Sequence, residues 1–540
     1  MKPDNRKIAS AMERAARHFQ TGAYDQASTF CKKILDSNPR HTGALGLLGL
    51  VSAIHGKLPA AIDLFRRAIR IEPENTVLNK NLARALVTEG RYEEGLKYYS
   101  RVATLLPENS EAYYDIACTY LKMGDADKAE LHFNCALSIN HNNVNARVNL
   151  GGLLRMQGRH PEAIKHYELA LKMSPTLREA LTGLGLALQE TGNLVTARKV
   201  LDRATNLYPE DADAHFNKAL CHLINADYER GWTEYEWRWK RPGKQPRNFN
   251  HPIWRGEPLG NRTILIYAEQ GIGDEIMFSS CLPDIQAQAR HVIIDCEPRL
   301  APLFSRSFPR ATIHGRYQNT TDTRIDHGVR IDMQSPAGSL PLYLRKTTSD
   351  FPNTGSYLVA DPHTRAGWEK RLNMPGKGLK IGISWKGGGT PLTNSTRSIE
   401  LKCWHEILKQ ERVHFINLQH GESRREADDI KNQTGVTIHS FPEIDPLIEL
   451  DNFAALISAM DLVISIDNST VHLAGALGVP VWLLLPVVPD WRWTMAGDRT
   501  PWYSSVRMFR KQQGQKWEDL LITVSEELAA LLRTAQSVND

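Results

Sequence analysis

The sequence predicts a helical repeat array followed by an α/β region, and three observations support this fold class. Residues of one type recur every 34 positions in the first part of the chain, this spacing stops near Trp239, and apolar strand-like runs then alternate with helical patterns. Since 540 residues are too many for one compact core, we expect two or more domains.

The helical array is predicted from several residue series that share the 34-residue step. Glycine punctuates the turn between two helices, and small residues let the helices approach each other. An aromatic or bulky residue fills the space between them, and proline stops the second helix. This pattern resembles tetratricopeptide repeats. About six repeats fit, with a degenerate seventh at about 210–238, so the array is expected to span 1–240. The glycines of the series are Gly22, Gly56, Gly90, Gly124, Gly158 and Gly192.

Stacked repeats form a superhelix with a concave groove, which is a common site for partners. Asn81, Asp115 and Asn149 occupy the same register in three successive first helices. A ladder of polar side chains can hydrogen-bond an extended peptide, although each residue alone is better explained as a solvated groove position. We therefore expect the array to bind a protein or peptide, with these three residues in the acceptor groove.

The composition disfavours several functional classes. The net charge of +5 is small for this length, so no nucleic-acid partner is expected. The seven cysteines are scattered and form no C-x-x-C pair, which is typical of buried packing residues in a reducing compartment. No stretch has the length and apolarity of a signal peptide or a membrane span. These features predict a cytoplasmic chain.

The α/β region is predicted to begin after a connection at 241–261 that is rich in Pro, Arg, Asn and Gly. A strand is expected from Thr263 to Ala268, followed by a glycine-rich turn and a helix from Glu275 to Asp284 with Asp274 as its N-cap. The turn contains G-x-G but lacks the third glycine of a dinucleotide fingerprint. A dehydrogenase is therefore disfavoured.

A second set of alternating strands and helices begins at Leu379. Its most informative segment is an apolar strand, Leu462 to Ile466, followed by Asp467-Asn468-Ser469-Thr470 and a helix. Ligands of open α/β sheets bind at the carboxyl ends of strands, and helix N-termini favour anions, so this turn either holds a phosphate or only caps the helix. Two such sets predict two Rossmann-like lobes with a cleft between them. The lobes and a last helix are expected at 262–360, 378–515 and 516–540.

Five motif groups of the α/β region resemble a known family. They are "AEQGIGDEIMFSSCLP", "ISWKGGG" with "RSIEL", "NLQHGE", "LVISIDNSTVHLAGALGVPVWLLLPVVPDWRW" and "TPWYSSVRMFRK". These motifs follow one another along residues 250–515, and together they resemble GT-B glycosyltransferases of the heptosyltransferase-like family. The whole chain is similar to bacterial proteins that join tetratricopeptide repeats to such a domain. The resemblance implies a GT-B fold, a nucleotide-sugar donor on the C-terminal lobe, an acceptor against the N-terminal lobe, and neither a metal nor another cofactor.

The candidate catalytic base is Asp274. From the residues alone it is better explained as a helix cap, which Asp forms well. The resemblance implies a different role, because the family's proposed base lies in a Gly-Asp turn that falls on Gly273-Asp274. A carboxylate there would accept the proton of the attacking hydroxyl. Glu269 and Glu275 remain alternatives for this role.

The candidate donor site combines two loops of the C-terminal lobe. Lys386 and neighbouring glycines suit a phosphate at a strand end, and hydroxyls with free N–H groups at a helix start suit a diphosphate. Because Asp467 would repel phosphate, we expect it to orient the turn or bind a sugar hydroxyl. Asn468 departs slightly from the family pattern. The expected donor-binding residues are Ser384, Lys386, Gly387, Gln419, Asp467, Asn468, Ser469, Thr470, His472 and Arg492.

These features together predict a glycosyltransferase. It would move a sugar from a nucleotide-sugar to a hydroxyl with inversion, without a metal, and the repeats suggest a protein Ser or Thr as the acceptor. The rival hypothesis is a non-catalytic scaffold with a degenerate glycosyltransferase-like domain. Lys386 and the turn from Asp467 to His472 are both present, which favours the enzyme.

Overall fold

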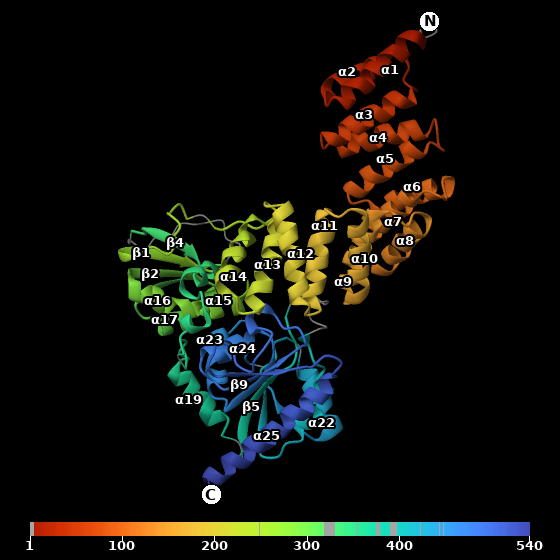
Figure 1. Cartoon of the computed structure of the whole chain (residues 1–540). Coiled ribbons are helices and arrows are strands. Elements are labelled where there is room, and N and C mark those ends of the chain that lie inside the picture. Colours follow the sequence, from red (N-terminus) through yellow and green to blue (C-terminus); the bar gives the residue numbers. More distant parts are fainter. Residues whose placement is uncertain are drawn as a thin grey trace. The chain divides into compact units, whose positions relative to one another are not determined.

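The computed structural model describes residues 5–247, 249–317, 330–353, 355–373, 378–388, 397–421, 423–441, 443–446 and 448–539. The chain forms two compact units, Met1–Ala187 and Leu188–Asp540, and each is described by itself. Figure 1 shows helical pairs in the first unit, and further helices with two sheets in the second.

The first unit is a stack of antiparallel helical pairs, as the 34-residue spacing predicts. All six glycines of the series have positive φ values, between 73° and 89°, which suits the turns that they form. Close packing explains why small residues recur where the two helices of a pair meet. A Cβ added at Gly49 would lie only 2.7 Å from the Phe65 ring. The helices are α1 (Asn5–Gln20), α2 (Tyr24–Ser37), α3 (Thr42–Ile54), α4 (Leu58–Ile69), α5 (Thr76–Thr88), α6 (Tyr92–Leu105), α7 (Ser110–Met123), α8 (Ala126–Ile139), α9 (Val144–Met156), α10 (His160–Met173) and α11 (Arg178–Glu190), whose end belongs to the second unit.

A further series with the same spacing, which was not predicted, caps the first helix of several pairs. The side chains of His41, Asn75, Asn109 and Asn143 each accept a hydrogen bond from a backbone N–H group in the first turn of the helix that follows. Each lies two positions after the proline slot, so the residue that stops one helix is followed closely by the residue that starts the next.

Removing one cap should destabilise the array locally. We expect Asn109→Ala to lower the free energy of unfolding by about 1 kcal/mol, because two N–H groups of α7 would lose the Asn109 Oδ1 acceptor. Chemical denaturation followed by circular dichroism measures this change. Asn142→Ala, at an exposed turn position, is the control and should stay within about 0.5 kcal/mol of the unmodified chain. Equal effects of the two changes would contradict a capping role.

The second unit begins with helices that continue the repeat pattern. They are α12 (Leu194–Leu207), α13 (Ala212–Ile224), α14 (Tyr228–Tyr235) and the short η1 (Glu236–Lys240). The regular pairs end at Tyr235, close to the predicted change near Trp239. These last pairs belong to the same compact unit as the α/β region.

The first sheet is parallel with strand order β3-β2-β1-β4. Its strands are β1 (Gly260–Tyr267), β2 (Ala289–Cys296), β3 (Ala311–Gly315) and β4 (Met333–Pro336). The expected helix from Glu275 to Asp284 is wrong in its bounds, because the segment forms α15 (Ile272–Phe278), η2 (Ser279–Cys281) and α16 (Leu282–Gln288). The order reverses at β1, so the loop after β1 lies where such sheets bind ligands. The remaining helices are η3 (Pro298–Leu300), α17 (Ala301–Ser307), η4 (Ala337–Ser339), α18 (Pro341–Leu344) and η5 (Thr348–Asp350).

The second sheet is parallel with strand order β10-β9-β8-β5-β6-β7, so the order reverses between β5 and β8. An α/β region with parallel sheets is therefore confirmed. The strands are β5 (Leu379–Ser384), β6 (Val413–Asn417), β7 (Ile438–His439), β8 (Leu462–Ile466), β9 (Val481–Leu485) and β10 (Val506–Arg510). The helices are α19 (Pro362–Arg371), η6 (Leu401–Trp404), α21 (His405–Leu408), α22 (Arg424–Thr434), α23 (Leu450–Ser458), α24 (Ser469–Ala476), η7 (Trp491–Trp493) and α25 (Trp517–Asn539).

Candidate active site

One cleft of about 250 Å³ joins loops from the two sheets of the second unit. Gly273 and Asp274, after β1, line it together with loops at the carboxyl ends of β5, β6, β8 and β9. Five expected donor residues are present, namely Asp467, Asn468, Ser469, His472 and Arg492. The other lining residues, which were not predicted, are Gly388, Arg397 and His420.

Asp274 is not the N-cap of its helix, and that expectation is corrected. The helix starts three residues earlier than expected, so Gly271 holds the N-cap position and Asp274 lies in the first turn. The Asp274 carboxylate accepts a hydrogen bond from the Gly271 N–H group at 3.2 Å. Its other partner is the Arg492 guanidinium, whose Nε lies 3.0 Å from Asp274 Oδ1 and whose Nη2 also contacts it.

A chain of alternating charges continues from Asp274 through the cleft. Arg492 Nη1 donates to Asp490 Oδ1 at 2.5 Å, and Arg397 Nη2 donates to Asp490 Oδ2 at 3.3 Å. Arg397 Nη1 then lies 3.4 Å from Asp467 Oδ2. Three carboxylates thus share two guanidinium groups, and both arginines line the cleft.

The members of this charge chain differ in how readily they lose charge. Burial raises the pKa of Asp467, and this outweighs the opposing effect of Arg397. Burial acts in the same direction on Asp490, but the charges of Arg492 and Arg397 outweigh it and lower the pKa of Asp490. Arg492 stays charged, because the carboxylates of Asp274 and Asp490 overcome its burial and raise its pKa. Asp467 is therefore easier to protonate than Asp490.

The turn after β8 does more than cap a helix, as the contacts of Asn468 show. Its Oδ1 accepts a hydrogen bond from the Thr470 N–H group at 3.1 Å, so Asn468 caps α24. Its Nδ2 donates to Ser384 Oγ at 2.8 Å and to the Lys386 carbonyl at 3.2 Å. The residue thus caps the helix, ties it to the loop after β5 and lines the cleft.

The loop after β5 is built differently from the expected phosphate loop. Gln419 Oε1 accepts hydrogen bonds from Ser384 Oγ and from the N–H groups of Trp385 and Lys386, at 3.0, 2.9 and 2.7 Å. The Lys386 ammonium forms an ion pair with Glu426 of α22. Gly387 donates its N–H to Ser398 Oγ at 3.1 Å. Of the expected donor residues, the described cleft wall lacks Ser384, Lys386, Gly387, Gln419 and Thr470.

His472 is a buried, neutral side chain on α24 that lies against the loop after β1. Burial and the charge of Arg492 lower the pKa of His472 to about 4. Its Nδ1 lies 2.8 Å from the Tyr503 hydroxyl, and its ring stacks on Trp493 at a centroid distance of 5.0 Å. The edge of the His472 ring lies against the loop that contains Gly273 and Asp274, since a Cβ added at Gly273 would be 3.0 Å from His472 Cδ2.

The alternative bases are engaged elsewhere. Both oxygens of Glu269 accept from Arg238, at 2.9 and 2.7 Å, and its Oε1 also accepts from the Gly338 N–H group at 2.8 Å. Glu275 is buried and accepts from the Glu297 N–H group at 2.9 Å. Neither residue lines the cleft.

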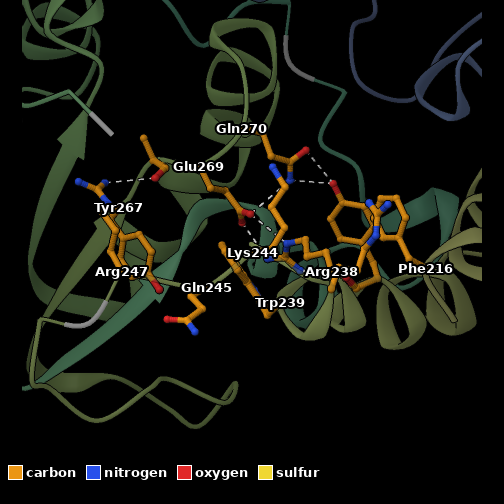
Figure 2. Close-up of a pocket in the computed structure, with 12 residues that line it drawn as sticks. Phe216, Arg238, Trp239, Lys244, Gln245, Arg247, Tyr267, Glu269 and Gln270 are labelled. Carbon is orange, nitrogen blue, oxygen red and sulfur yellow. Dashed lines mark hydrogen bonds and ion pairs between the residues drawn. The ribbon is translucent and has the colours of Figure 1, made fainter. Parts of the chain in front are cut away.

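Two larger pockets flank these loops. The first, of about 510 Å³, lies between the last helices and the end of β1, and we call it the junction pocket (Figure 2). The second, of about 410 Å³, lies beyond the carboxyl ends of β6 and β7, and we call it the strand-end pocket. The junction pocket is lined by Phe216, Tyr235, Arg238, Trp239, Arg241, Lys244, Gln245, Arg247, Tyr267, Ala268, Glu269 and Gln270. The strand-end pocket is lined by Asn417, Gln419, Gly421, Ser423, Arg424, Ser440, Phe441, Ile444, Asp445, Pro446, Phe453 and Leu456.

The polar ladder of the first unit is partly engaged within the array. Asp115 Oδ2 lies 3.1 Å from the Lys80 ammonium. Asn149 Nδ2 donates to the Tyr114 hydroxyl at 3.0 Å and contacts Cys118 Sγ at 3.5 Å. Asn81 is half-buried. Two of the three expected groove residues therefore link neighbouring repeats, and their role toward a partner stays a prediction.

The described ranges contain neither a metal-binding cluster nor a membrane-spanning helix. No group of three or more His, Cys, Asp or Glu side chains among the described residues could hold a metal ion. Within the same residues, no helix is both long enough and apolar enough to cross a membrane.

Comparisons with known proteins identify the repeats. Tetratricopeptide repeat models match residues 73–142 and 142–210, and a second tetratricopeptide model matches 12–76. The helical pairs of the N-terminal region are therefore tetratricopeptide repeats, as predicted.

Among curated proteins, the chain is similar to Protein FlbA of Caulobacter vibrioides. The two are 33% identical over 334 residues, which are 59% of this chain and 56% of FlbA, so the chain spans little more than half the length of this relative. Among solved structures, it is similar to Pseudomonas aeruginosa PilF, with 20% identity, 40% of this chain and 98% of that chain covered, and a TM-score of 0.36. A tetratricopeptide repeat protein from Parabacteroides merdae has 20% identity, 43% and 91% coverage, and a TM-score of 0.37.

The residues that were missed left little signal in the sequence. Arg397 lies in "RSIEL", far along the chain from the acids that it contacts, and Asp490 precedes "WRW". Only the three-dimensional structure brings Arg397 within 3.4 Å of Asp467. One signal for Arg397 was its position after the lysine–glycine loop, because phosphate sites often contain Arg.

Proposed function

We propose that the second unit is a glycosyltransferase of GT-B type that moves a sugar from a nucleotide-sugar donor to a hydroxyl group. The observation that carries this proposal is a single cleft that contains Asp274 from one sheet and two arginines, Arg397 and Arg492, from loops of the other. A carboxylate beside fixed cations suits a transfer in which a hydroxyl is deprotonated and a phosphate leaves.

The diphosphate of the donor fits the cationic part of the cleft. Arg397 and Arg492 offer guanidinium N–H groups, and Ser469 lies on the cleft at the start of α24. Arginines and helix N-termini both favour phosphate. The two guanidinium groups would offset the charge of the leaving diphosphate, so the proposal includes no metal ion.

The nucleoside fits the strand-end pocket. Gln419 lines this pocket and the next residue, His420, lines the cleft, so the two sites are adjacent along the chain. Asn417, Ser423 and Ser440 offer polar groups for a ribose, and Phe441 offers an aromatic ring for a base.

The transfer is a single displacement. The acceptor oxygen attacks the anomeric carbon and gives its proton to the Asp274 carboxylate. At the same time, the bond from that carbon to the diphosphate oxygen breaks, and its electron pair leaves with the diphosphate. Attack opposite the leaving group inverts the anomeric carbon. His472, which is neutral and close to the base loop, would bind the donor without adding charge.

The acceptor class is a Ser or Thr hydroxyl of a protein. Tetratricopeptide repeats occupy the N-terminal region, and such arrays generally bind proteins or peptides. Joining a protein-binding array to a transferase supports a polypeptide acceptor more than a small molecule. The groove residues Asn81, Asp115 and Asn149 belong to this part of the proposal.

Nucleotide titration tests the donor site. We expect calorimetry with UDP, GDP, ADP, CDP and CMP to show binding of one nucleotide, and Arg397→Gln to weaken it by about tenfold or more, because a charge-assisted phosphate contact is lost. Lys386→Gln is the matched control, because Lys386 pairs with Glu426 and should lose less affinity. A larger loss in Lys386→Gln than in Arg397→Gln would restore the lysine loop as the phosphate site.

The rival hypothesis is a scaffold whose α/β part is inactive. It is favoured by one observation, the ion pair of Lys386 with Glu426 outside the cleft. Absence of binding to every nucleotide in the same titration would support it.

Diphosphate binding should also be coupled to a proton. Burial raises the pKa of Asp467, and its other charged neighbours are Arg397, Asp490 and Arg492. A bound anion disfavours the charged carboxylate further, so binding should take up protons at Asp467, and affinity should fall as pH rises. Calorimetry in buffers of different ionisation enthalpy measures this uptake. Asp467→Asn should take up fewer protons than the unmodified chain, and equal uptake would contradict the assignment.

A further inference from the structure

The junction pocket lies on the same strand end as the proposed base. Tyr267 and Gln270 line the pocket, and Gly271 and Asp274 follow directly at the start of α15. Gln270 has a φ of 66°, a backbone conformation that non-glycine residues rarely adopt and that recurs at functional sites. An occupant of this pocket would therefore lie beside the loop that contains Asp274.

Two acceptor side chains of the junction pocket, Glu269 and Gln270, are already used. Both oxygens of Glu269 accept from Arg238, which fixes this buried pair. Gln270 Oε1 accepts from the Tyr235 hydroxyl at 3.0 Å, and its amide nitrogen contacts Glu269 Oε2 at 3.3 Å. Figure 2 shows this network on one side of the pocket, with Tyr267 and Arg247 on the other.

Several donors of the junction pocket remain open. Arg241 donates through Nε to Asp213 at 2.6 Å, and no partner of its terminal nitrogens is found in the described chain. Among the described residues, the exposed Lys244 has no ion pair. Tyr267 is 1% exposed, yet within the described structure its hydroxyl has no hydrogen-bond partner. That hydroxyl is shielded from solvent, so the open donors that face the pocket are those of Arg241 and Lys244.

Aromatic rings pack against two of the guanidinium groups on the pocket wall. The Arg238 guanidinium lies 4.6 Å from the Trp239 ring and 4.7 Å from the Tyr235 ring. Arg241 lies 4.6 Å from the Phe216 ring. Stacking on aromatic rings fixes guanidinium groups without using their N–H edges.

A pocket whose cationic donors are open and whose carboxylate, Glu269, is paired with Arg238 selects a ligand that accepts hydrogen bonds. We propose that the junction pocket binds a carboxylate side chain of the acceptor polypeptide, an Asp or Glu near the hydroxyl that receives the sugar. This inference rests on the proposed function and adds a sequence preference to it. The pocket volume of about 510 Å³ is within the range of ligand pockets, and the carboxylate would meet the cationic side chains of Lys244 and Arg241.

Peptide display tests this preference. The full chain is used to select from a library of short peptides with a central Ser and randomised flanks, without donor. We expect Asp and Glu to be enriched in the flanks. For a selected peptide labelled with a fluorophore, replacing its acidic residue by the matching amide should weaken binding by about tenfold, as lost charge-assisted contacts do.

Variants show whether the junction pocket is responsible. The double variant Lys244→Gln, Arg241→Gln should bind the acidic peptide and its amide twin with equal affinity. Lys240→Gln is the control, because Lys240 lies over the Trp237 ring and 3.4 Å from Glu210, outside the pocket wall. Unchanged thermal unfolding confirms that the variants are folded.

Two results would overturn the inference. One is a selection without acidic enrichment, and the other is an acidic preference that persists in the double variant. Because the selection needs no donor, it is independent of the nucleotide titration. A chain that binds a nucleotide but shows no acidic preference contradicts only this inference, whereas acidic preference without nucleotide binding contradicts only the proposed function.

Discussion

Asp274→Asn should abolish sugar transfer and, at the same time, tighten nucleotide binding. Loss of a general base typically reduces turnover by about a hundredfold to ten-thousandfold. The opposite effect on binding follows from the ion pair between Asp274 and Arg492. A diphosphate must compete with this carboxylate for the guanidinium, so removing the negative charge should raise affinity by about three- to tenfold, or ~1 kcal/mol.

Turnover with the nucleotide-sugar and calorimetric affinity for the nucleotide are measured on the same variant. Asp498→Asn, an exposed carboxylate whose side chain is 66% accessible, is the control and should change neither quantity. Retained turnover in Asp274→Asn would remove Asp274 from the chemistry. Weaker nucleotide binding would mean that Asp274 supports the position of Arg492 and does not compete with the donor.

The ion pair also suggests an order of events. While Arg492 donates to Asp274 Oδ1 through two nitrogens, that oxygen is occupied and is not available to an acceptor hydroxyl. A donor that draws Arg492 toward its phosphates would release the base only when a sugar is in place. The proposed enzyme would therefore bind its donor before it activates the acceptor.

The sequence predicted the repeat architecture well because the pattern depends on local chemistry. Turn glycines, small contact positions and prolines each act within one helical pair, so a fixed spacing reports them directly. The capping series of His41, Asn75, Asn109 and Asn143 has the same origin and was detectable from the same spacing. The helix bounds around Asp274 were less predictable, because Gly271, a weak signal, starts the helix.

The sequence predicted the candidate site only where its residues are adjacent in the chain. The turn after β8 was recognised from four adjacent polar residues, and the cleft contains three of them. Partners that are distant in sequence were not predictable, such as Arg492 for Asp274 or Glu426 for Lys386. Long polar side chains can reach several neighbours, and tertiary packing decides which one they contact.

The limits of the second unit also depend on tertiary packing. The repeat spacing assigns α14 to the array, yet its Trp232 is buried among residues of the α/β region. The indole N–H donates to the Arg345 carbonyl at 2.9 Å, and the ring meets that of Trp491 at a centroid distance of 5.5 Å. Trp491 in turn lies 4.5 Å from the Arg492 guanidinium. The last helical pair thus supports the cleft.

Trp232→Ala should therefore destabilise the whole second unit. We expect a loss of about 3–5 kcal/mol in the free energy of unfolding, because a large buried ring and its hydrogen bond are removed together. Denaturation followed by circular dichroism measures this loss. Trp237→Ala is the matched control, since the half-buried Trp237 stacks mainly on His215 and should cost less than about 1.5 kcal/mol. If the two variants were equally stable, α14 would be a dispensable end of the array, and Arg492 would not depend on it.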